Sequence, residues 1–335
     1  MRTALRSLIF AAALAATAFA AGAQTTPSPA KCDDQTKADL YKRFTDGHKG
    51  DANQQKVAYE AGKQYVAVCT EDDQYRQYIT RWLAAYDKAA REFEVGASLT
   101  NAERDKRYAE AVRAGKEMLA IRPDDLTLLM RVAWDGYNGV ASKAEGVDVA
   151  AAQGAATTAL QMIGAGKKPA DRYDEQTKTY VANWWPFPGR EDAVGGLNFA
   201  LGNFALASNR ADDAIKYLYA AAQAGGFAQK APQTYLFLGN AYTAARYTPL
   251  SQDFNARFGG KPESPESTAA LARLNESVDH VIDAYARAAA LTTDQQTKAA
   301  LVQQLTAFYK FRHDNSDAGL QDFIAHVLAQ PMPAP

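Results

Sequence analysis

The chain has 335 residues, of which 47% are hydrophobic, and its 37 basic side chains nearly balance its 38 acidic ones. This balance provides no basic field for nucleic acid or anionic lipid, so neither is an expected partner. Alanine is abundant, glycine lies mostly between periodic segments, and β-branched clusters are scarce. The composition therefore favours helix almost throughout, and no stretch alternates well enough to predict a strand.

The N-terminus is typical of a secretory signal peptide. Arg2 and Arg6 precede an uncharged, alanine-rich run, and Ala21-Gly22-Ala23 supplies a small-residue cleavage site. The uncharged run is shorter than the roughly 20 apolar residues that span a bilayer. We therefore expect residues 1–23 to be removed after Ala23, and the mature chain to be secreted or periplasmic, with no segment inserted in a membrane.

The first predicted elements form a helix hairpin closed by a disulfide. Asp33-Asp34 offers an N-cap to a helix at residues 36–45, and helical spacing resumes at 54–68. In an antiparallel hairpin the start of the first helix lies beside the end of the second, where Cys32 and Cys69 are found. Because an exported protein with two cysteines is expected to pair them, the sequence predicts one bridge. Two free thiols or a partial metal site are the alternatives.

A repeated helical pattern is clearest at residues 235–242, Tyr-Leu-Phe-Leu-Gly-Asn-Ala-Tyr. A large aromatic residue, a leucine, a glycine and a second aromatic residue follow one another at helical spacing. This octet resembles the first helix of a tetratricopeptide repeat. The glycine of that motif lets a neighbouring helix approach closely, while the large residues fill the groove between helices.

Weaker copies of the pattern occur elsewhere. Leu201-Gly202 is followed by a stripe of small and large residues at 214–221, and a similar stripe lies at 302–325. At 118–125, Pro123 is expected to stop one helix and an acidic residue to cap the next, which opens at Leu126. The resemblance implies an all-α, right-handed α-solenoid of antiparallel helix pairs with loop insertions.

Two interruptions divide this pattern. Residues 171–196 hold the string Asn183-Trp-Trp-Pro-Phe-Pro-Gly189, whose prolines exclude helix. We expect helix pairs at 24–170 and repeats at 197–330, joined in one continuous superhelix. Two glycines and three prolines mark residues 248–265, which we expect to be a mobile surface excursion with few regular hydrogen bonds.

Catalytic and metal-binding motifs are not found in the sequence. The four histidines are spread along the chain, and none has the paired spacing of a metal site. His280 and His326 are expected to be helix-face residues, and pairs such as Asp212-Asp213 precede helices that they would cap. The sequence therefore predicts neither catalytic residues nor a metal or cofactor.

The resemblance does imply two binding residues. In the family, the residue after the motif glycine often faces a concave groove, and in peptide-binding members asparagines there hydrogen-bond the peptide backbone. Asn203 and Asn240 occupy this position. The lysines that would grip a terminal carboxylate are replaced by Phe199 and Leu236, so no carboxylate clamp is expected. A solvated surface role for both asparagines is the alternative.

Trp184 and Trp185 are the other candidate binding residues. Adjacent tryptophans on a proline-restrained loop would suit a flat platform for a sugar ring or an anchor for a partner's proline. Equally, the two tryptophans would suit a packing role as a plug that fills a gap where the stacking of repeats is interrupted. The sequence thus favours a non-catalytic scaffold that binds a protein or peptide partner outside the cytoplasm. A carbohydrate-binding accessory protein and an enzyme on a helical scaffold are the alternatives.

Overall fold

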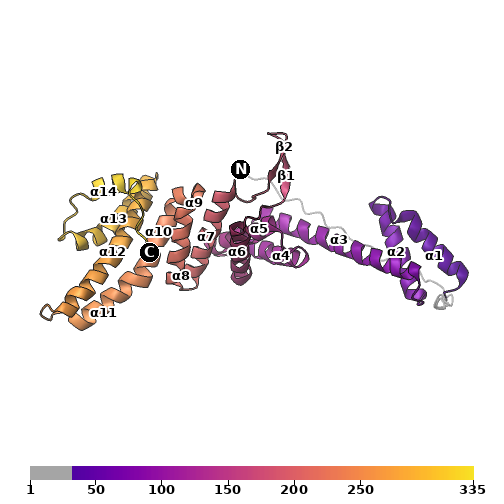
Figure 1. The fold of residues 1–335 in the computed structure, drawn as a ribbon, viewed down its shortest axis with the longest axis horizontal. Coiled ribbons are helices and arrows are strands. Elements are labelled where there is room, and N and C mark those ends of the chain that lie inside the picture. Colours follow the sequence, from indigo (N-terminus) through magenta and orange to yellow (C-terminus); the bar gives the residue numbers. More distant parts are fainter. Residues whose placement is uncertain (1–31) are drawn as a thin grey trace, which may run out of the picture. The chain divides into compact units, whose positions relative to one another are not determined.

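The computed structural model describes residues 32–335, so the predicted signal peptide lies outside the described residues. The described chain is almost entirely helical, as expected (Figure 1). It divides into two compact units, the first ending at Ala89 and the second spanning Ala90–Pro335, with the boundary inside the long helix α3, Gln74–Arg104. The sequence places its division elsewhere, at 171–196, which lies within the second unit. Among the described residues, no helix has both the length and the hydrophobicity needed to cross a membrane.

The first unit contains the predicted helix hairpin. Helix α1 spans Asp34–Gly47 and helix α2 spans Ala52–Val68, close to the expected bounds. The Asp33 side chain accepts from Thr36 N and caps α1, while Asp51 and Gln54 form a capping box on α2. The two helices pack with the first half of α3 around a small core, whose largest fully buried side chains are Phe44, Tyr65 and Ile79.

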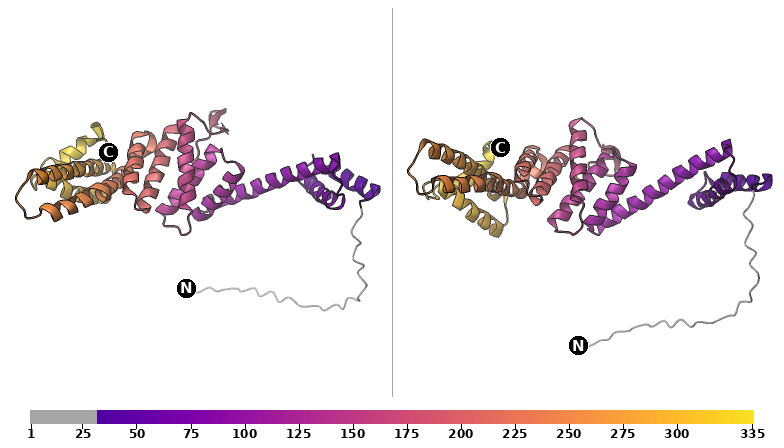
Figure 2. Two further views of the ribbon diagram at one scale, coloured as in Figure 1. Left: turned by 60° about the horizontal axis from the view of Figure 1, so that its bottom comes forward. Right: turned by 90° about the horizontal axis from the view of Figure 1, so that it is seen from below.

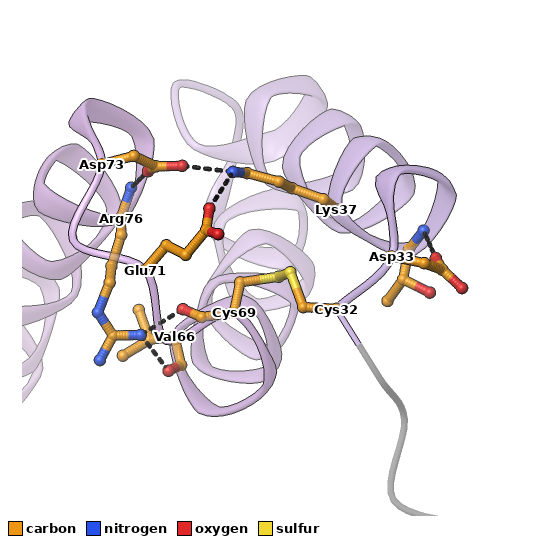
Figure 3. The surroundings of a disulfide bond; sticks show 9 residues. Cys32, Asp33, Lys37, Val66, Cys69, Glu71, Asp73 and Arg76 are labelled. Atoms are coloured by element: carbon orange, nitrogen blue, oxygen red, sulfur yellow. Dashed lines mark hydrogen bonds and ion pairs between the residues drawn. A yellow bond between two sulfur atoms is a disulfide. The ribbon is translucent and has the colours of Figure 1, made fainter.

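Cys32 and Cys69 lie at disulfide distance at the open end of this hairpin (Figure 3). Their Cα atoms are 5.0 Å apart and their sulfur atoms 2.07 Å apart. The Arg76 guanidinium donates to the carbonyl oxygens of Val66 and Cys69, the latter over 2.6 Å, and so satisfies carbonyls that the end of α2 leaves without helical partners. The Lys37 ammonium lies 2.5 Å from the Asp73 carboxylate. Covalent and polar contacts therefore close the hairpin at one end.

In the second unit, most helices pack on the next long helix along the chain (Figure 1). The views of Figure 2 show the same succession. Helix α5 also packs on α7, two helices further on. The bounds are α4 Tyr108–Ile121, α5 Leu126–Ala141, α6 Val149–Gly164, α7 Arg190–Ala207, α8 Ala211–Gln223, α9 Gly226–Lys230, α10 Pro232–Tyr242, α11 Thr248–Phe258, α12 Pro265–Leu291, α13 Gln295–Arg312 and α14 Leu320–His326.

Local signals set several of these bounds. Helix α4 ends at Ile121, just before Pro123, and the Asp125 side chain accepts from Leu128 N to cap α5, as the sequence predicts. A π-helical turn, η1 at Thr243–Tyr247, joins α10 to α11, and a short 3-10 turn, η2 at Val327–Ala329, follows α14.

Four glycines allow close helix packing in this unit. A Cβ atom at any of them would come within 2.6 Å of a side chain on a neighbouring helix, so only glycine fits without movement. The close approach expected at residues 202 and 239 is confirmed, and residues 115 and 136 are further cases that the sequence pattern did not reveal. The contacts are Gly115 with Val132 of α5 at 2.3 Å, Gly136 with Ala152 of α6 at 2.2 Å, Gly202 with Leu218 of α8 at 2.5 Å, and Gly239 with Tyr285 of α12 at 2.6 Å.

The expectation of no strand is wrong for a short hairpin. Strands β1 (Asp171–Asp174) and β2 (Thr179–Ala182) pair antiparallel, with Asp171 opposite Ala182. Most of the hairpin is exposed, so it has no buried face to impose an alternation of apolar and polar residues. Its most evident stabilising contact is the cross-strand pair Tyr173 and Tyr180, whose ring centroids are 5.4 Å apart.

The expectation for residues 248–265 is also wrong in part. Helix α11 covers Thr248–Phe258, so most of the segment has regular hydrogen bonds. Pro265 lies in the first turn of α12, where a missing backbone N–H costs little, and Pro249 directly follows the π-helical turn η1 within a continuous run of helical residues. Only residues 259–264 are irregular. None of the α11 residues is fully buried, so the surface location does hold.

Candidate functional site

The packing glycines of α5, α7 and α10 fix the direction of the residues that follow them. Consecutive residues of an α-helix lie about 100° apart around its axis, so a residue that follows a glycine facing the neighbouring helix points to the side. These residues are Tyr137, Asn203 and Asn240, and they occupy the same place on three helices.

The sequence motif did not reveal Tyr137. The glycine before it follows Asp135, whereas the glycine in each of the other two helices follows a leucine. The spacing of the contacts also relates the two helices: Gly136 and Gly202 each contact a residue sixteen positions further along the chain.

A row of aromatic rings crosses these three helices. The ring centroid of Tyr137 on α5 lies 5.2 Å from that of Phe199 on α7, which lies 5.8 Å from that of Phe237 on α10. Trp134 extends the row on α5, with its centroid 4.7 Å from Tyr137. Trp134, Tyr137 and Phe237 are half-buried and Phe199 is buried. The row is therefore apolar and partly buried, and part of its aromatic ring surface is accessible to solvent or to a partner.

Asn240 is exposed, yet its side-chain amide is held by hydrogen bonds. The Tyr285 hydroxyl donates to Asn240 Oδ1 over 2.8 Å, and Gln304 Nε2 donates to the same hydroxyl over 2.8 Å. Burial raises the pKa of Tyr285, which keeps the hydroxyl protonated as a donor. Within residues 32–335 the Nδ2 group of Asn240 has no acceptor, so it remains a donor for another molecule.

Asn203 offers the opposite group. Its Nδ2 donates to the Phe199 carbonyl oxygen in its own helix over 2.8 Å, and the side chain is half-buried. Its Oδ1 accepts no hydrogen bond from the described part of the chain. Helices α7 and α10 contact each other, and Phe199 and Phe237 stack one helical turn from the two asparagines. The structure thus places a free acceptor and a free donor beside one aromatic row, which we call the aromatic-amide face.

The tryptophan loop at residues 183–189 is not helical, as its prolines predict. Phe187 is its most buried side chain, and it fits against Gly196, where a Cβ atom would come 2.3 Å from the ring. Trp184 is half-buried against the same core cluster, whereas Trp185 is 60% exposed. Phe187 is therefore part of the core, and of the two tryptophans Trp185 is the more accessible to a ligand.

Among residues 32–335, no group of three or more His, Cys, Asp and Glu side chains is arranged to hold a metal ion. Comparison with known proteins found no matching family model, no matching curated protein and no matching solved structure.

Proposed function

We propose that the chain is a non-catalytic scaffold outside the cytoplasm that binds an extended peptide segment of a protein partner on the aromatic-amide face. The single observation that carries the proposal is the pairing of a free acceptor on Asn203 with a free donor on Asn240, beside stacked Phe199 and Phe237. Each residue of an extended peptide presents one N–H and one C=O, which such a pair complements.

The spacing of the face also suits an extended chain. Packed helices lie about 8–10 Å apart, and an extended peptide rises about 3.3 Å per residue, so neighbouring helices meet groups roughly three residues apart. The half-buried aromatic rings between the amides would take up apolar side chains of the peptide.

We further propose that the second unit is a right-handed solenoid of tetratricopeptide type. The support is that four helices carry a packing glycine and that most long helices pack on the next along the chain. In such solenoids the small rotation between repeats creates an extended concave surface, which is their usual binding surface. The aromatic-amide face lies on the helices that would line it.

Export to the periplasm or the cell exterior is the proposed location. The pattern of residues 1–23 supports a signal peptide, and the Cys32–Cys69 pair at disulfide distance supports an oxidising compartment.

Selection from an unbiased peptide library against residues 24–335 tests this function. We expect enriched peptides that bind with a Kd of about 1–100 µM, with affinity reduced about tenfold or more in Phe237→Ala. Phe93→Ala is the matched control, because Phe93 is 81% exposed on α3 and lies outside the aromatic row. Failure to enrich any peptide, or equal binding by the Phe237→Ala and wild-type chains, would contradict the proposal.

A carbohydrate-binding role is the second candidate. It is favoured by Trp185 and Tyr180, which are 60% and 73% exposed in the loop and the adjoining hairpin. Glycan-array binding that disappears in Trp185→Ala but persists in Phe237→Ala would support this role over peptide binding.

A further inference from the structure

A second site lies at the junction of α10, η1, α11 and α12, with Pro335 at its edge. It is a pocket of about 460 Å³, within the range of about 300–1,000 Å³ that is typical of small-molecule sites. It shares no lining residue with the aromatic-amide face, so the inference below does not depend on the proposed function.

Three residues that line this pocket each carry a buried polar atom without a partner in the described part of the chain: Tyr242 Oη, Ser277 Oγ and His280 Nδ1, all closed off from solvent. Tyr242 and Ser277 are only 3% and 4% exposed. An unpaired buried polar group destabilises the fold, so three of them around one cavity need an explanation.

Tyr235, on the same helix as Tyr242, provides a comparison. It is 4% exposed, and its hydroxyl donates to the Gln229 carbonyl oxygen over 2.9 Å. Burial alone therefore does not leave a tyrosine of α10 unpaired. Of the seven unpaired buried polar atoms in residues 32–335, three belong to residues that line this pocket.

The charges of the pocket favour an anion. Arg246 and Arg273 both line it, and Glu276 is the single carboxylate among its lining residues. Arg246 also pairs with Asp212 at 3.0 Å, whereas Arg273 is exposed and forms no ion pair within residues 32–335. Burial lowers the pKa of His280, so the imidazole is neutral near pH 7 and adds no positive charge.

The remaining lining is apolar, with Pro249 and Leu250 from α11. Arg246 belongs to the π-helical turn η1, a rare conformation that often marks functional sites. The Tyr242 and His280 rings stack with centroids 4.8 Å apart, which holds both side chains in place. The pocket thus combines an apolar wall, unpaired polar groups and two guanidinium groups.

We propose that this pocket binds a small amphipathic carboxylate. The arginines pair with the carboxylate, and the apolar body of the ligand lies against Leu250 and Pro249. A small movement of the pocket wall on binding uncovers the hydroxyl groups of Tyr242 and Ser277, which then donate to the carboxylate oxygens. A free organic acid and the C-terminal end of a peptide with an apolar last residue share this chemistry.

Calorimetric titration with 3-phenylpropanoate and octanoate tests the proposal, with their neutral amides as controls. We expect a Kd of about 1 mM or tighter for at least one acid, and at least about fivefold weaker binding by its amide. Acetyl-Ala-Phe with a free carboxylate identifies the source: tighter binding than 3-phenylpropanoate supports a peptide end, and weaker binding supports a free acid. No binding by either acid, or equal binding by acid and amide, would overturn the proposal.

Three variants locate the binding. Tyr242→Phe and Arg273→Gln are expected to weaken binding of the acid at least about fivefold, while Tyr235→Phe leaves it unchanged. Without ligand, Tyr242→Phe should keep or raise the melting temperature, because its hydroxyl has no partner to lose, whereas Tyr235→Phe should lower it. Arg273 is exposed, so its replacement tests the site without risk to the fold. Wild-type affinity in both Tyr242→Phe and Arg273→Gln would place the acid elsewhere and contradict the proposal.

Discussion

The Tyr285 hydroxyl donates to Asn240 Oδ1 over 2.8 Å, and the ring of the same tyrosine packs against Gly239, where a Cβ atom would come within 2.6 Å. One side chain of α12 therefore makes the close helix contact and also orients the amide next to it. Gln304 of α13 donates to the same hydroxyl, so the orientation depends on three helices. The packing of the second unit and the chemistry of the aromatic-amide face are connected at this tyrosine.

Removing that hydroxyl separates the two roles. Tyr285→Phe keeps the ring packing but frees the Asn240 amide to rotate, so we expect binding of selected peptides to weaken about threefold to tenfold. The melting temperature should change little, because Asn240 and Gln304 are both exposed and regain water. Fluorescence titration measures the affinity, with Tyr242→Phe as the control. Unchanged peptide affinity in Tyr285→Phe would show that the amide needs no orientation.

The packing glycines allow a matched comparison of stability. Gly202→Ala would place a Cβ atom 2.5 Å from Leu218, which should lower the free energy of unfolding by about 1–3 kcal/mol. Gly154 is also helical but has no atom within 4 Å of its Cβ position, so Gly154→Ala should raise that free energy by about 0.5–1 kcal/mol. Urea unfolding of both variants checks this pair. Equal stability of the two would argue against tight packing of α7 on α8.

In the tryptophan loop, the Phe187 side chain should stabilise the fold and the Trp185 side chain should not. Phe187 contacts the Trp134 ring at a centroid distance of 5.2 Å and stacks on Phe227 at 6.3 Å, so Phe187→Ala should lower the free energy of unfolding by about 3–5 kcal/mol. Trp185→Ala should change it by no more than about 0.5 kcal/mol, because the side chain is exposed. Thermal and urea unfolding measure both values. A large loss of stability in Trp185→Ala alone would reverse this assignment.

Asp135 should make stability depend on pH. It is 7% exposed on α5, and burial, followed by the nearby Glu103 carboxylate, raises its pKa to about 8. Glu103 itself pairs with Arg131, with N···O distances of 2.8 and 2.7 Å. The native carboxyl group keeps its proton over a range in which the unfolded chain, with an ordinary pKa of 3.8, has lost it. Stability from this group is therefore complete below about pH 4 and falls as the pH rises toward about 8.

Asp135→Asn tests this dependence. The amide stays neutral, so the variant should be more stable than the wild type near pH 8, and its free energy of unfolding should fall less steeply between about pH 5 and pH 8. Urea unfolding across that range measures the slope. If the free energy of unfolding of the variant falls with pH as steeply as that of the wild type, Asp135 is not the group that keeps its proton in the native state.

Local signals made much of the fold predictable. The caps at Asp33 and Asp125 and the stop at Pro123 depend on short-range hydrogen bonding, so the sequence placed those helix ends closely. Other features lacked such a signal. The exposed hairpin at 171–182 has no buried face, and nothing in the sequence indicated that helix would continue from the π-helical turn η1 through Pro249.

The candidate sites were predictable only in part. Asn203 and Asn240 follow a recognisable glycine, but Tyr137 follows Asp135-Gly136, in which an acidic residue replaces the usual leucine. The groups of the carboxylate pocket come from α10, η1, α11 and α12, and its unpaired polar atoms lie on α10 and α12, which are far apart in the sequence. The sequence indicated a helix face for His280, and only tertiary packing shows which neighbours it meets there.

The affinity of the Asn203→Ala/Asn240→Ala double variant for library-selected peptides tests the central claim most directly. Binding should weaken about tenfold or more, because each lost hydrogen bond costs about 0.5–1.5 kcal/mol and 1.4 kcal/mol is about one decade. Asn101→Ala, an exposed helical control outside the face, should bind normally, and all variants should keep their melting temperature. Normal binding by the double variant, with binding abolished in Trp184→Ala and Trp185→Ala, would contradict the account and make the tryptophan loop the recognition site.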